Sequence, residues 1–242
     1  MTTVVVFNVA REPAAAQVLA DGRLVWPARK LPAGEDDHAA LAVAVGLAAS
    51  DLVGITLGQG DPGWAAARGT SEVVRVADVT VGDDDGATAA ALAAAVAEVD
   101  GAELVVIGDS EHHPGLAPAL AGYLGWPVVL AATSAVRIGS DVEATRRAGR
   151  VEETVSVPIP AVIAVAAATE ESSPPGMKAM LAARRLPVRD VTAADLGIAA
   201  VPAFEPTLTS LPSSTTARLI GGDPLQAATE LVKALRAEGV LE

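Results

Sequence analysis

Short runs of β-branched and aliphatic residues alternate with alanine-rich stretches through the first half of the chain. This alternation is typical of strand–helix crossover units that build a parallel sheet. The apolar runs predict strands at Thr3–Val9, Leu52–Leu57, Val73–Val76, Glu103–Ile107 and Val128–Ala131. The alanine-rich stretches predict helices at Asp37–Ala49, Trp64–Gly69, Thr88–Val99 and Gly115–Leu124, with Thr88 or Asp85 as the N-cap of the third.

From Ser134 the hydrophobic period changes to short alternating segments separated by turn residues. Tight turns at residues 139–140 and 148–149 are typical of antiparallel hairpins. We therefore predict an antiparallel set made of Ala135–Ile138, Val142–Arg146, Arg150–Val157 and Ala161–Ala166.

The C-terminal part of the chain has a different character. Residues 199–217 contain three prolines and no sustained period, which predicts an extended arm, and helical spacing of leucines predicts a helix at Pro224–Glu238. The predicted fold is α/β: a Rossmann-like, mostly parallel sheet with helices on both faces, an antiparallel hairpin region and an extended C-terminal arm. Residues 1–198 would form the α/β domain and residues 199–242 the arm and helix. Such an arm often reaches another subunit, but packing on its own domain is an equal alternative.

Composition narrows the classes of partner. The 242 residues carry 30 acidic and 17 basic side chains, a net charge of −13, which would repel a nucleic acid backbone. The chain contains no cysteine, so disulfides, thiol nucleophiles and thiolate metal sites are excluded. The longest apolar runs are about half the ~20 residues that a membrane span needs, and we expect a cytoplasmic protein without membrane insertion.

Several short motifs resemble reactive or ligand-binding sites. The glycines of residues 58–63 follow a strand in a dinucleotide-like spacing, but Pro62 removes an amide donor and no acidic residue stands at the expected distance, so a tight turn is favoured. Residues 108–112 resemble a serine nucleophile elbow, but no histidine follows to complete a triad. The neighbouring cluster Asp109, Glu111, His112 and His113 lacks a second ligand group, so we expect no metal site and no catalytic residue.

Residues 170–198 have the character of a docking segment. A polar, proline-bearing loop leads into a short helix that carries Met177 and Met180 and ends in a basic pair. Flexible apolar side chains beside cations suit a transient protein contact. We expect docking through Pro175, Gly176, Met177, Lys178 and Met180.

The order of several motifs resembles one family. Four segments together resemble the beta subunit of electron transfer flavoproteins. They are Gly122-Tyr-Leu-Gly-Trp126-Pro127, the hairpin Arg147–Val157 followed by Pro160-Ala-Val, the segment Met177–Gly197 and the tail Ala217–Glu238. The resemblance implies a non-catalytic subunit in a heterodimer whose alpha subunit holds FAD. That FAD takes electrons from a dehydrogenase and passes them to an acceptor. In the family the C-terminal arm wraps the partner, and a leucine that aligns with Met177 anchors in the dehydrogenase.

The resemblance also implies a nucleotide site, because most beta subunits bury an AMP and bifurcating relatives hold a second FAD there. The corresponding positions would be Asn8, Asp37, Leu57, Gly108, Asp109, Gly115 and Leu116. Here the family's Asn-Pro-aromatic turn is replaced by residues 34–37, Gly-Glu-Asp-Asp, and its second loop is shortened and contains Pro114. The aromatic residue near the flavin is missing too. We therefore hypothesise weak or absent AMP binding.

Two classes of function are compatible with these patterns. The first is an electron-transfer subunit that positions a partner's FAD and docks a dehydrogenase. The alternative is a stand-alone adenine-nucleotide-binding α/β module, such as a sensor or a small ligase. The altered nucleotide loop disfavours the second class, and the C-terminal arm favours the first.

Overall fold

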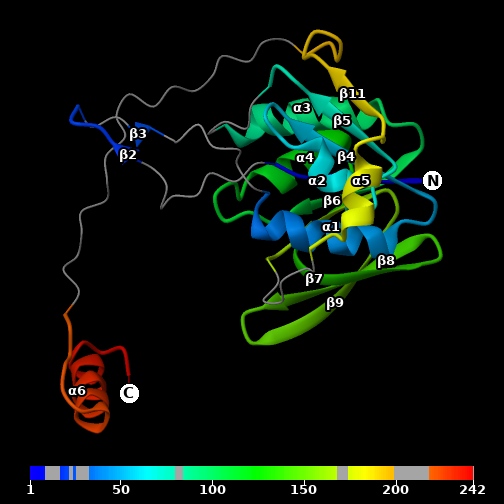
Figure 1. Ribbon diagram of the computed structural model, residues 1–242. Helices are drawn as coiled ribbons and strands as arrows, with labels where there is room; N and C mark the ends of the chain where they lie inside the picture. Colours follow the sequence, from blue (N-terminus) through cyan, green and yellow to red (C-terminus); the bar gives the residue numbers. More distant parts are fainter. Residues whose placement is uncertain are drawn as a thin grey trace.

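A nine-stranded sheet lies at the centre of the protein in a computed structural model (Figure 1). The structure describes residues 1–8, 17–21, 24–25, 33–79, 84–167, 174–198 and 218–241. The strand order is β11-β5-β4-β1-β6-β10-β7-β8-β9, with antiparallel pairing only among β7, β8 and β9. The strands are β1 (Thr2–Val6), β4 (Asp51–Leu57), β5 (Glu72–Val76), β6 (Ala102–Gly108), β7 (Val128–Ile138), β8 (Asp141–Ala148), β9 (Val151–Pro158), β10 (Ala161–Val165) and β11 (Val188–Val191); β2 (Gln17–Val18) and β3 (Leu24–Val25) form a separate two-residue ladder.

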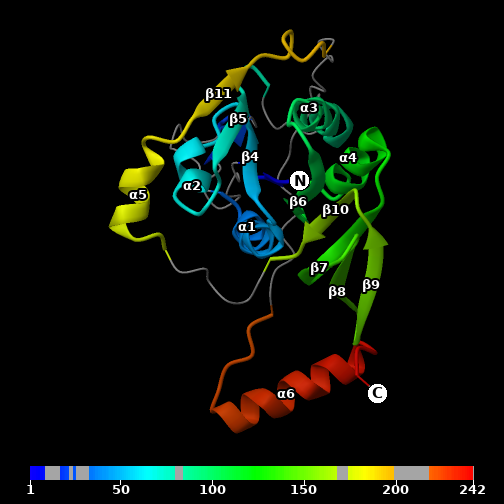
Figure 2. The same cartoon turned by 90° about the vertical axis from the view of Figure 1, so that its right-hand side faces the viewer.

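Helices cover both faces of the sheet. Seen edge-on, α3 and α4 lie on one side of the strands, whereas α1 and α2 lie on the other (Figure 2). The helices are α1 (Glu35–Leu47), α2 (Pro62–Ala66), α3 (Asp85–Ala97), α4 (Leu116–Leu124), α5 (Met177–Ala183) and α6 (Pro224–Ala237). This three-layer arrangement confirms the predicted α/β, mostly parallel fold.

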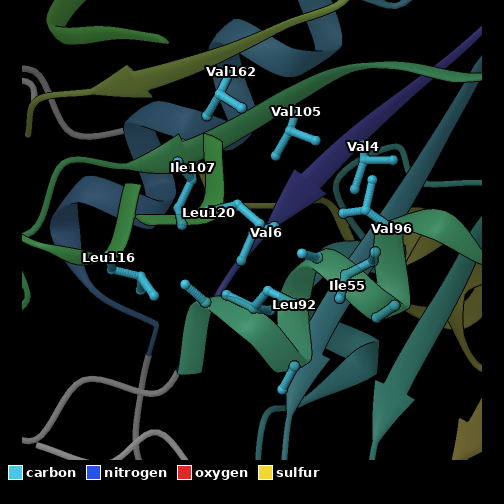
Figure 3. Close-up of a cluster of buried hydrophobic side chains, with 14 of the residues drawn as sticks. Val4, Val6, Ile55, Leu92, Val96, Val105, Ile107, Leu116, Leu120 and Val162 are labelled. Atoms are coloured by element: carbon cyan, nitrogen blue, oxygen red, sulfur yellow. The ribbon is translucent and has the colours of Figure 1, made fainter. Parts of the chain in front are cut away.

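The larger core lies between the sheet and the helices α3 and α4. Alternate residues of β1 and β6, such as Val6 and Val105, face Leu92 of α3 and Leu120 of α4 (Figure 3). The intervening residues, such as Val5, face α1 on the opposite side. Because both faces are covered, the parallel strands are continuous apolar runs rather than alternating ones. Alanine at most helix positions allows the helices to lie close to these strands.

One strand was predicted wrongly. The sequence pattern assigned Ala161–Ala166 to the antiparallel set, but β10 is parallel to both neighbours and lies between β6 and β7. All five of its residues are buried, as in a strand covered on both faces. The chain therefore adds β8 and β9 to the sheet beyond β7, and only afterwards places β10 between β6 and β7.

Other boundaries also differ. β7 is one strand where two were predicted, with a register shift near its middle, and β11 was not predicted at all. The predicted helix at Trp64–Gly69 begins earlier, at Pro62, and α3 is capped by Asp84 rather than Asp85 or Thr88. Val9 and the predicted arm at 199–217 lie outside the described residues. The division into 1–198 and 199–242 stays a prediction.

The helix α6 is confirmed almost to the residue, and it stands apart from the sheet (Figure 1). Asp223 caps it by accepting hydrogen bonds from the N–H groups of Leu225 and Gln226. None of its residues is buried, and Leu225, Leu231 and Val232 are exposed. An amphipathic helix is normally stabilised by packing of its apolar face, and the apolar face of α6 has no such packing among the described residues.

Candidate functional site

The strand order reverses direction between β1 and β6. From β1 the chain crosses through α1 to β4 on one side, and from β6 it crosses through α4 to β7 on the other. In open α/β sheets this reversal leaves a crevice at the carboxyl ends of the two strands, where ligands commonly bind. We call this region the switch edge and define it by Asn8, the segment 34–37, Gly108, Asp109 and Gly115. The structure thus brings these sequence-predicted positions to one edge of the sheet.

Asp37 joins β1 to α1. Its Oδ2 accepts hydrogen bonds from the N–H groups of Asn8 and Gly34, both at 3.1 Å. The side chain is only 6% exposed. Burial and the neighbouring Asp36 charge raise the pKa of Asp37 well above its usual value, although the two N–H groups oppose the shift. Asp37 therefore links the residue after β1, Asn8, to the residue before α1, Gly34.

Asp36 lies over the end of β6. Its Oδ2 is 2.5 Å from the position that a Cβ on Gly108 would occupy, so only glycine fits there. Burial raises the pKa of Asp36, helped by the charge of Asp109, and opposed by hydrogen bonds from the backbone N–H groups of Asp36 and Asp37. No local sequence signal predicts this contact, because it depends on where α1 meets β6.

Asp109 closes the other side of the switch edge. Its Oδ2 accepts a hydrogen bond from the N–H of Ala131 at 2.7 Å, and its own N–H donates to Val165 O at 2.8 Å. Ala131 has a positive φ of 55°, a conformation that is rare for a residue with a Cβ. The Asp109 carboxylate thus stabilises the unusual backbone conformation of Ala131 in β7.

Asp85 is the residue that sequence reasoning missed. Predicted only as a candidate helix cap, it accepts a hydrogen bond from Gly115 N–H at 2.9 Å through Oδ2. Its Oδ1 lies 2.8 Å from His113 Nδ1. The first turn of α3 is therefore tied to the loop that leads into α4. An acidic residue at the start of a helix indicates a cap, but it does not indicate this long-range contact.

Two of the predicted positions do not present their side chains to the switch edge. Leu116 is 4% exposed and belongs to the core beside α3 and α4. Leu57 is 1% exposed, and its carbonyl accepts a hydrogen bond from Gly60 N–H at 3.0 Å. That bond belongs to a tight turn ahead of α2, which Asp61 caps, as the turn interpretation expected.

Sequence comparison supplies the family. The family model described as electron transfer flavoprotein domain matches residues 34–196, about two thirds of the chain. The match runs from the first turn of α1 past the end of β11.

The chain belongs to the electron transfer flavoprotein domain family. Membership links it to flavin-dependent electron transfer at the level of the family. No group of three or more metal-ligating side chains occurs among the described residues, and no helix within those ranges has the length and hydropathy needed to cross a bilayer.

In this member of the family the serine elbow is an ordinary loop. Ser110 Oγ accepts from the N–H of His112 at 3.3 Å, and Ser110 O accepts from the N–H of His113. His113 is paired with Asp85 rather than with the hydroxyl. Ser110 and His113 therefore do not form the serine–histidine pair that nucleophilic catalysis requires.

The predicted docking residues lie on and before α5. Gly176 is its N-cap, and Met177 and Met180 are 74% and 51% exposed. Ala183, on the opposite side of the helix, is buried, and α5 packs against α2. The helix thus rests on the domain through small residues and leaves its two methionines uncovered in this chain.

Proposed function

We propose that the chain is the beta-type subunit of a heterodimeric electron transfer flavoprotein that works in the cytoplasm. A companion alpha subunit would hold the FAD, which takes up and releases the electrons. This chain would support that subunit and dock the dehydrogenase, without a catalytic residue of its own. The observation that carries the proposal is the family match over residues 34–196.

Helix α6 supports the assignment of a partner subunit. Its Leu225, Leu231 and Val232 are exposed to 78%, 48% and 39%. Burying a leucine side chain contributes about 1.5–3 kcal/mol, so an uncovered stripe of this kind favours association. A companion subunit that covers α6 accounts for the stripe.

Helix α5 supports the docking of a dehydrogenase. Met177 is the most exposed residue of the helix among its large apolar ones, and Leu181 adds a third uncovered side chain beside Met180. Methionine adapts its shape to a pocket at little cost, which suits a contact that must form and release at each turnover.

The assembly is tested by co-expression with a flavin-bearing companion subunit. We expect a yellow one-to-one heterodimer that survives gel filtration. Removing residues 218–242 should release the companion, whereas a tag placed on the C-terminus should not. A colourless monomer that binds ATP would reject the proposal and favour the stand-alone nucleotide-binding module.

Docking is tested on the heterodimer with its cognate dehydrogenase. Met177→Ala should raise the KM for the dehydrogenase about tenfold, corresponding to about 1.4 kcal/mol, and leave the flavin content unchanged. The matched control is Tyr123→Ala, because Tyr123 is 61% exposed on α4, on the other face of the sheet. Equal effects of the two variants would remove α5 from the docking surface.

A further inference from the structure

The backbone N–H groups of the switch edge bear on whether an adenine nucleotide can bind there. The family resemblance implies AMP or a second FAD at this edge, and phosphate groups bind proteins through N–H groups at helix starts and turns. A chain that holds such a phosphate must therefore present N–H groups without internal acceptors. The acceptors of these groups can be traced in the structure.

At the start of α1 the N–H groups are taken by aspartates. Asp37 Oδ2 accepts from Asn8 and Gly34, and the Asp36 carboxylate accepts from the N–H of Asp37. Asp36 also covers Gly108, where the backbone would otherwise approach a ligand closely. Both the donors and the space above β6 are thus occupied by side chains of this chain.

Two N–H groups at the start of α4 also have internal acceptors. Gly115 N–H donates to Asp85 Oδ2 at 2.9 Å, and Leu116 N–H donates to His113 O at 3.1 Å. Pro118, in the first turn, has no N–H. Across the edge, Ala131 N–H donates to Asp109. Each of these donors already has an acceptor, or is absent.

Charge acts in the same direction. The Asp36 carboxylate lies close enough to Asp109 for that charge to raise its pKa. A phosphate brought to the switch edge would add negative charge beside these groups and beside Asp85, in partly buried surroundings where such repulsion is strong. Of the two histidines near these carboxylates, His113 is already paired with Asp85, and the charge of His112 already acts on Asp36.

We infer that the aspartates of this chain replace the nucleotide phosphate at the switch edge, so that it binds neither AMP nor a second FAD. Asp85 and Asp37 are positioning residues in this arrangement: Asp85 links the start of α4 to the start of α3, and Asp37 links the start of α1 to Asn8 after β1. The heterodimer would then contain the companion's FAD as its sole nucleotide. This inference goes beyond the proposed function, because it concerns a site within this chain alone.

The first test measures nucleotide directly. The purified full chain is denatured with acid, and the extract is analysed by nucleotide chromatography; we expect no AMP and no FAD. Thermal unfolding at pH 7.5 should shift by less than about 1 °C with 5 mM AMP, since a ligand that binds only the folded state raises the midpoint. Stoichiometric AMP, or a rise of several degrees, would overturn the inference.

The second test asks whether Asp85 occupies an anion position. Asp85→Ala frees Gly115 N–H and should lower the unfolding midpoint, and 50 mM phosphate should restore about 3 °C or more, whereas chloride at equal ionic strength should not. Leu120→Ala is the matched control, because it weakens the same helix without freeing an N–H group. The absence of a phosphate-specific rescue, or equal rescue of the control, would overturn the assigned role of Asp85.

Both tests use the chain by itself. If no heterodimer forms on co-expression, the proposed function fails while these measurements still decide the inference. If a heterodimer forms, its extract should contain FAD without AMP.

Discussion

The buried Asp37 provides the sharpest test of how the chain is built. Asp37→Ala removes the oxygen that accepts from both Asn8 and Gly34. A lost helix cap costs about 0.5–2 kcal/mol, and a partly buried N–H without a partner costs about 1–3 kcal/mol. We expect a loss of about 3 kcal/mol in the free energy of unfolding, or roughly 6–12 °C in the midpoint for a chain of this size.

Asp37→Asn is the matched variant. Both hydrogen bonds go to one oxygen, Oδ2, so an amide with its oxygen at that position retains them. Because burial raises the pKa of Asp37, the neutral side chain suits the folded state, and we expect Asp37→Asn to lie within about 1 kcal/mol of the unchanged protein. Urea denaturation followed by circular dichroism measures both variants.

The same residue predicts a dependence on pH. The pKa of Asp37 is higher in the folded than in the unfolded chain, so its protonation stabilises the fold. That contribution is fully present below the ordinary value of 3.8 and is lost as the pH rises through the raised pKa. Asp37→Asn should therefore show a flatter stability profile above that value. The reasoning is refuted if Asp37→Ala and Asp37→Asn lose the same stability, or if the unchanged protein and Asp37→Asn show the same pH profile.

Three further predictions concern packing and surface contacts, each measured by the same denaturation assay. Leu120→Ala, at a fully buried position, should cost about 2–5 kcal/mol, and a loss below 1 kcal/mol would mean that the site collapses. Gly60→Ala should cost about 1–3 kcal/mol, because its Cβ would lie 2.8 Å from the Cβ and Cγ2 atoms of Thr56. Gly46→Ala is its comparison: the new Cβ in α1 would meet no atom within 4 Å, and the variant should gain about 0.5–1 kcal/mol of stability. Asp190→Ala removes two 2.8 Å hydrogen bonds from Arg75 at the exposed sheet edge and should cost less than about 1 kcal/mol, decreasing with salt.

The parts of the fold that follow from local patterns were predictable. Runs such as Leu52–Leu57 and the alanine-rich segments around them identified the crossover units, and leucine spacing identified α6. The place of β10 was not predictable in this way, because Ala161–Val165 follows a hairpin in the sequence, while its pairing with β6 is set by burial on both faces. β11 has only four residues, and its partly exposed pattern resembles a loop.

The switch edge shows the same division. Asn8, Gly108 and Asp109 follow apolar strands, so the sequence could place them at the carboxyl ends of the sheet. The acceptors of the N–H groups could not be found from local signals. Asp85 reaches Gly115 across 30 positions of sequence, and Asp37 reaches Asn8 across 29. An acidic residue at a helix start predicts a cap equally well whether or not it also contacts a distant loop.

The late arrival of β10 has a consequence for synthesis on the ribosome. Strands β6 and β7 flank it, so neither can complete its hydrogen bonding until residue 165 has left the exit tunnel. A nascent chain stopped after Pro158 would have its hairpin but would expose two unpaired strand edges in the middle of the sheet, the kind of surface on which polypeptides aggregate. Incomplete products of this gene should therefore be insoluble, rather than smaller folded domains.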